Sequence, residues 1–97
     1  MLEKEIEGVL RRRVVELGGL CWKFVSPGTR GVPDRIIVMP GGRVVFAELK
    51  SAEGQPSVLQ MFRLTQLQAL GVDAKLVVGI DGVDALLGEL AKGVMYG

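Results

Sequence analysis

The sequence contains no histidine, and this absence narrows the chemistry open to the chain. It excludes nucleophilic catalysis by Ser-His or Cys-His pairs, zinc sites built on imidazole and the usual general base of neutral pH. A metal site in this chain would therefore use oxygen ligands. Such ligands favour Mg²⁺, Mn²⁺ or Ca²⁺.

Cysteine and long apolar runs are also scarce. Cys21 is the single cysteine, which excludes a disulfide within the chain and favours a core role for this residue. The first residues, Met-Leu-Glu-Lys-Glu, do not resemble a secretion signal. No apolar run approaches the roughly 20 residues that span a bilayer. We therefore expect a cytoplasmic protein with no membrane partner.

Charge of one sign is not in excess, since the net charge is +1. The overall charge thus does not predict a nucleic-acid partner, although it leaves room for a local basic patch. The length of 97 residues predicts one domain with one core, spanning residues 1–97.

The spacing of apolar residues predicts an α/β fold with the order α-β-β-β-α-β-α. The expected elements are a helix over 2–17, strands over 20–25, 33–39 and 43–50, a helix over 57–70, a strand over 74–80 and a helix from Asp81. Continuous apolar runs in the strands predict a sheet that helices cover on both faces. Trp22 and Phe24 are expected on one face of the first strand, in the core or in an interface.

Two short motifs, Pro33-Asp34 and Glu48-Leu49-Lys50, flank a predicted hairpin whose turn is at residues 40–42. Antiparallel pairing about this turn would bring Asp34 and Glu48 side by side, with the register open by one or two positions. A purely structural interpretation is that Glu48 and Lys50 are an ordinary exposed strand pair and that Asp34 is a turn residue. The combined spacing favours a site.

Two neighbouring carboxylates repel each other unless a cation lies between them. We therefore expect Asp34 and Glu48 to bind a divalent metal ion, with waters and the backbone carbonyl of Leu49 completing its shell. Such an ion would activate a bound water and stabilise charge on a phosphate. Lys50, two residues after Glu48 on the same strand face, could orient or deprotonate that water or neutralise the phosphorane.

These residues resemble the PD-(D/E)xK nuclease signature, and further segments resemble the virus-type replication-repair nuclease (VRR-NUC) family in order and spacing. The resembling segments are Gly18-Gly19, residues 23–28, residues 31–35, residues 46–50, Gln60 and Leu70-Gly71. The resemblance covers nearly the whole chain. It implies a restriction-endonuclease-like core, with a mixed central sheet flanked by helices.

Stand-alone members of this family occur in phages and bacteria and resemble Holliday-junction resolvases. The resemblance implies an Mg²⁺-dependent or Mn²⁺-dependent endonuclease that acts on branched DNA in repair or recombination, without an organic cofactor. It makes Asp34 and Glu48 metal ligands and Lys50 the catalytic lysine. Gln60 would support the site, and an acid of the first helix would complete it, with Glu3 expected first and Glu7 second.

The loop before Asp34 is either a flexible turn or a clamp for DNA phosphates. In the second interpretation Ser26, Thr29 and Arg30 would contact DNA, together with Arg35. Gln60 also fits a capping box with Ser57, so capping and support of the site are both open.

The apolar last helix, from Val83 to Leu90 and on to residues 94–96, suggests a homodimer. A competing class is a non-catalytic DNA-binding or interaction module on a nuclease scaffold. A sequence-specific restriction-type enzyme ranks lower, because the chain is short for an element that reads the major groove.

Overall fold

The structure is a computed structural model that describes residues 1–96, with side chains described up to Val94. The predicted order of helices and strands is confirmed. The elements are α1 (Glu3–Glu16), β1 (Leu20–Lys23), β2 (Arg35–Val38), β3 (Val44–Lys50), α2 (Val58–Ala69), β4 (Ala74–Val78) and α3 (Gly79–Tyr96). β1 and β2 are shorter than predicted, so Phe24 and Asp34 lie just outside their strands.

The four strands form one mixed sheet in the order β1-β2-β3-β4. β1, β2 and β3 are antiparallel neighbours, whereas β4 is parallel to β3. A parallel pair needs a long crossover, and α2 provides it between β3 and β4. The predicted mixed sheet flanked by helices is therefore confirmed.

The turn between β2 and β3 fixes how these strands pair. Gly41 and Gly42 both have φ of +87°, a region that L side chains rarely adopt. Beside them, the Met39 N–H donates to the Arg43 carbonyl at 2.8 Å. This closure gives the register Arg35↔Ala47, which the sequence could fix only to within one or two positions.

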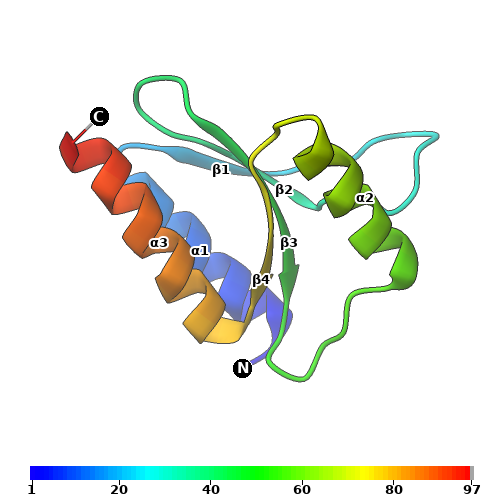
Figure 1. Cartoon of the computed structure of the whole chain (residues 1–97). Coiled ribbons are helices and arrows are strands. Elements are labelled where there is room, and N and C mark those ends of the chain that lie inside the picture. Colours follow the sequence, from blue (N-terminus) through cyan, green and yellow to red (C-terminus); the bar gives the residue numbers. More distant parts are fainter. Residues whose placement is uncertain (97) are drawn as a thin grey trace.

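Helices lie on both faces of the sheet, α1 and α3 together on one face and α2 on the other (Figure 1). The core lies between the sheet and the pair α1 and α3. Its fully or nearly fully buried members include Ile6, Leu10, Val14, Cys21, Ile37, Val45, Ala47, Leu49, Val77, Val83, Leu86, Leu87 and Leu90. Cys21 is thus a core residue, as predicted.

This packing corrects the interpretation of the last helix. Its apolar residues Val83 and Leu90 are 0 % and 1 % exposed, because they pack inside the domain and not against a second copy. Val94 is 40 % exposed, and the predicted contribution of the Met95 and Tyr96 side chains lies outside what the structure describes. No helix within residues 1–96 is long and apolar enough to cross a membrane.

The sheet face that α2 shares is only partly covered, because α2 packs against β4. Leu20 and Trp22 on β1 are 46 % and 59 % exposed, and Val44 on β3 is 40 % exposed. Of the two places expected for Trp22, the core is therefore excluded, and an interface stays a prediction. Phe24 is half-buried and packs edge-to-face on Phe46, with ring centroids 5.3 Å apart.

Candidate active site

Asp34 and Glu48 lie side by side, as their spacing predicts. The register Arg35↔Ala47, continued by one residue, places Asp34 opposite Glu48. The Leu49 N–H donates to Asp34 Oδ1 at 3.1 Å, which holds this carboxylate against the end of β3. The charge of Asp34 also acts directly on the ionisation of Glu48. The hairpin thus brings together two acids that are fourteen positions apart.

The strand register also explains why a proline precedes Asp34 in the first motif. Continued by two residues, the pairing places Pro33 opposite Leu49. Proline has no N–H to donate, so it cannot pair with the Leu49 carbonyl as an ordinary strand residue would. The N–H of Leu49 is bound by the Asp34 side chain instead. The Leu49 carbonyl therefore has no β2 amide opposite it and could serve as a third oxygen ligand beside the two carboxylates.

Glu48 is a buried acid, and the protein provides few hydrogen-bond partners for its carboxylate. The residue is 2 % exposed, and its Oε1 has no hydrogen-bond partner in the part of the chain that the structure describes. Burial, followed by the negative charge of Asp34, raises its pKa to about 7, and Glu3 raises it further while Lys50 opposes the shift. A cation would relieve both the burial cost and the repulsion.

Lys50 and Gln60 approach the same carboxylate oxygen of Glu48. Lys50 Nζ lies 3.7 Å from Glu48 Oε2, and its side chain is 19 % exposed. Gln60 Nε2 donates to Glu48 Oε2 at 3.4 Å, while Gln60 Oε1 accepts from the Ser57 N–H at 2.8 Å. Ser57 Oγ in turn accepts from the Gln60 N–H at 3.1 Å. The capping box is therefore formed, and Gln60 reaches the site at the same time.

The two acids of the first helix are placed differently. The charge of Glu3 raises the pKa of Glu48, so Glu3 acts on the site. Glu7 forms an ion pair with Arg35 at 2.8 Å. This difference agrees with the preference for Glu3, whose role stays a prediction. Within residues 1–96, no three acidic or cysteine side chains gather closely enough to form a metal cluster by themselves.

Arg35 requires a correction. It was expected to contact DNA, but the residue is only 5 % exposed. The reason is strand alternation: on β2, Arg35 and Ile37 point to the helix-covered face, opposite to the face of Ile36. The guanidinium is bound to Glu7 and to the Asp34 carbonyl and is thus removed from a DNA surface.

The loop that precedes Asp34 is exposed and rests on α2. Thr29 and Arg30 are exposed, and Ser26 is half-buried. Arg63 Nε donates to the Arg30 carbonyl at 2.9 Å, which ties the loop to the helix. A Cβ at Gly31, where φ is +82°, would lie 2.7 Å from a Leu59 carbon. The three predicted DNA contacts therefore lie on a held loop, and their role stays a prediction.

The sequence did not indicate Arg63, and it indicated Glu7 and Arg35 without the ion pair that joins them. Arg63 follows Gln60 by three positions, so helical spacing could have indicated that both face the same way. Period-two alternation along β2 could have indicated that Arg35 points away from Asp34's strand face. Nothing in the sequence gives the partner of either guanidinium.

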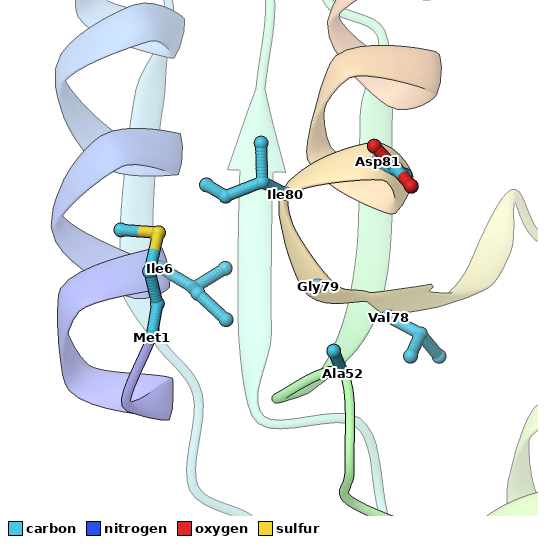
Figure 2. A pocket seen from close by; sticks show the side chains of 7 residues that line it. All are labelled: Met1, Ile6, Ala52, Val78, Gly79, Ile80 and Asp81. Atoms are coloured by element: carbon cyan, nitrogen blue, oxygen red, sulfur yellow. The ribbon is translucent and has the colours of Figure 1, made fainter.

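A hollow of about 340 Å³ lies near the site but does not contain it (Figure 2). It is bounded by the first residues of α1, the loop after β3 and the start of α3. Its lining is Met1, Ile6, Ala52, Val78, Gly79, Ile80 and Asp81. None of the motif residues lines it, and Asp81 has the one charged side chain among these seven lining residues. The acids of the site instead lie at the open end of the β2–β3 hairpin, away from its turn.

The oxygens of this site fit a hard divalent cation: two carboxylates and one backbone carbonyl. One of the carboxylates is buried, with an oxygen that has no partner among the described residues. With the lysine beside them on a mixed sheet, the fold and the site define a nuclease domain of the PD-(D/E)xK type.

Comparison with known proteins identifies the family. The chain is 44% identical over 69 residues to "Putative nuclease p44" of Acyrthosiphon pisum secondary endosymbiont phage 1, covering 71% of this chain and 74% of that protein. A solved structure described as "VRR_NUC domain" superimposes with a TM-score of 0.81 at 25% identity, covering 89% of this chain and 94% of the other. No family model matches the chain. The chain belongs to the VRR-NUC family of nucleases.

Proposed function

We propose that the chain is a metal-dependent, structure-specific DNA endonuclease, and that its substrate is a four-way junction. The observation that carries the proposal is the pairing of Asp34 with buried Glu48, whose Oε1 has no partner in the described part of the chain. The family supports nuclease chemistry on DNA. The proposal includes Mg²⁺ or Mn²⁺ as the cofactor, a homodimer as the working form and a role in DNA repair or recombination within the cytoplasm.

Asp34, Glu48 and the Leu49 carbonyl would hold the ion. When bound, such an ion lowers the pKa of a water ligand and stabilises negative charge on the scissile phosphate. Lys50 lies 3.7 Å from Glu48 on the same strand face. From there its ammonium group orients the attacking water and offsets the charge that builds on the phosphorane. Gln60 donates to Glu48 and holds this carboxylate in place.

The loop over residues 26–31 supplies the contacts to DNA. Thr29 and Arg30 are exposed beside the site, and Arg63 fixes the loop on α2 through the Arg30 carbonyl. A hydroxyl and a guanidinium on a held backbone suit phosphate oxygens. These contacts position the backbone of the DNA and do not read its sequence.

The test is cleavage of a labelled four-way junction, with plain duplex and flap DNA alongside, in Mg²⁺ and in EDTA. We expect cutting of the junction in Mg²⁺ alone. Asp34→Asn, Glu48→Gln and Lys50→Ala should each lower the rate by about 100-fold or more while the fold survives. Asp84→Asn on α3 is the matched control and should cut at the normal rate.

Full activity in any of the three site variants would refute the assignment. Binding of junction DNA without cleavage in Mg²⁺, Mn²⁺ and Ca²⁺ would instead favour the non-catalytic module. Equal cutting of junction, flap and plain duplex would reject the four-way junction as the specific substrate. The chain would then be a nuclease of broader substrate preference.

A further inference from the structure

The guanidinium of Arg35 links helix α1 to the first carboxylate of the site. Its Nη2 lies 2.8 Å from Glu7 Oε2 on α1. Its Nη1 donates to the Asp34 carbonyl at 2.8 Å and lies 3.6 Å from Asp34 Oδ2. One arginine therefore contacts both the main chain and the side chain of Asp34, and a helix on the opposite face of the sheet anchors it.

These contacts divide the Asp34 carboxylate between two partners. Oδ1 accepts from the Leu49 N–H at 3.1 Å, and Oδ2 faces Arg35. A carboxylate that is hydrogen-bonded at one oxygen and faces a guanidinium at the other is restricted in its rotation about the Cβ–Cγ bond. The planar fork of arginine suits this task, because its donors have fixed directions that a lysine does not provide.

Stability alone gives a poor reason for an arginine at this position. The side chain is 6 % exposed, and its Nε has no acceptor among the residues that the structure describes. Ion pairs taken out of water often contribute nothing net compared with apolar residues of similar volume. A methionine would fill the same space against α1 without an unsatisfied donor. The arginine is thus best explained by what it does to Asp34.

We propose that Arg35 is a positioning residue that orients the Asp34 carboxylate for metal binding, with Glu7 as its anchor on α1. The inference rests on the proposed function, because it assigns a task toward the cation that Asp34 and Glu48 would share. It also gives Glu7 a role different from that of Glu3: Glu7 acts through Arg35, whereas Glu3 acts on Glu48 by its charge.

The experiment measures Mn²⁺ binding in the absence of DNA, by calorimetric titration and by the electron paramagnetic resonance signal of the free ion. The variants are Arg35→Lys and the double variant Arg35→Met/Glu7→Gln, which removes both charges of the pair. We expect Mn²⁺ to bind about 10-fold to 100-fold more weakly in each. Thermal unfolding of the double variant should occur at the same temperature as in the wild type or higher.

The matched control is Arg13→Met/Asp84→Asn, which removes another ion pair between α1 and the rest of the domain, at 3.7 Å. It should leave Mn²⁺ affinity unchanged. In cleavage assays, raising Mn²⁺ should restore the rate of Arg35→Lys, because the defect is in binding the ion. A merely structural role would lower the melting temperature and leave the metal affinity of the folded fraction unchanged.

Unchanged Mn²⁺ affinity in the folded Arg35 variants would overturn the proposal. If these variants fail to fold, Glu7→Gln decides, since its side chain is 37 % exposed and its loss is tolerated more readily. Weaker Mn²⁺ binding by Glu7→Gln supports the anchor, and normal binding rejects it. A wild-type protein that binds no Mn²⁺ would reject the proposed function itself, whereas normal wild-type binding with unaffected variants rejects only the role of Arg35.

Discussion

The carboxylate of Glu48 lowers the stability of the metal-free fold, although the proposed chemistry requires it. It is 2 % exposed and faces Asp34, so the protein without metal must either protonate it or hold a buried charge. A residue chosen for stability would be neutral here. The acid therefore makes the free energy of unfolding depend on pH in a direction opposite to that of most carboxylates.

The pKa of Glu48 rises from 4.5 to about 7 on folding, through burial and the charge of Asp34. Between these values the unfolded chain has lost the proton and the native chain still holds it, so stability falls as pH rises. We expect the metal-free protein to lose up to about 3 kcal/mol between pH 4.5 and 7 from this group. Denaturant unfolding at several pH values measures it, with Glu48→Gln as the control that flattens the decline. Parallel profiles for the two proteins would contradict the prediction.

For single residues, the sequence predicted positions correctly where the residue type and its spacing in the chain both indicated the same site. Asp34, Glu48 and Lys50 could be placed together because a hairpin and a period of two determine their positions. Arg35 could not be interpreted in the same way, because its partner Glu7 belongs to a helix 28 positions earlier. The direction of a side chain follows from the strand, but its long-range partner follows from packing.

At the scale of elements, the start of α2 serves the helix and the site together. Gln60 accepts from the Ser57 N–H with one amide atom and donates to Glu48 with the other. The capping box was predictable from Ser57 and Gln60 alone. The approach to Glu48 was not, since it depends on how the crossover places α2 over the sheet.

Two substitutions separate these roles. Ser57→Ala removes the cap and should lower the free energy of unfolding by about 1 kcal/mol, with cleavage retained. Gln60→Glu keeps a side chain that can accept from the Ser57 N–H, but it places a negative charge beside Glu48. We expect reduced cleavage, with a loss of stability that comes from repulsion at Glu48 and not from loss of the cap. Chemical denaturation and junction cleavage on both variants provide the test, and loss of activity in Ser57→Ala with none in Gln60→Glu would reverse the assignment.

At the scale of the whole molecule, the open part of the sheet is an apolar surface that no helix of the described residues covers. Leu20, Trp22 and Val44 lie on it and are 40 % to 59 % exposed. The sequence pattern allowed Trp22 in the core or in an interface, but it indicated the last helix as the homodimer interface. An apolar stripe on a helix looks the same whether it is buried within one domain or between two copies, so the pattern could not decide.

If the proposed homodimer forms, we expect it to bury this sheet face. Trp22→Glu should then shift the protein to monomer in sedimentation at micromolar concentration, because a charge would be desolvated in the interface. Leu70→Glu is the matched control, since Leu70 is apolar and 83 % exposed but lies at the end of α2. A wild-type protein that sediments as a monomer would remove the homodimer, and a dimer insensitive to Trp22→Glu would place its interface elsewhere.

The overall fold was predictable because each element has a local signal in the sequence. Helices have an apolar stripe, strands have short apolar runs, and the hairpin has two glycines at its turn. What the local pattern does not contain is the coverage of the sheet by α2, which leaves one face open while α1 and α3 bury the other. That coverage depends on crossover length and on packing between distant elements.

A metal ion shared by Asp34 and Glu48 is tested most directly by a crystal that is grown or soaked with Mn²⁺ and measured for anomalous scattering. We expect an anomalous peak between the carboxylates of Asp34 and Glu48, close to the Leu49 carbonyl, and its loss in crystals of Glu48→Gln. A wild-type crystal with no peak between these two side chains, or a peak there that persists in Glu48→Gln, would contradict this expectation.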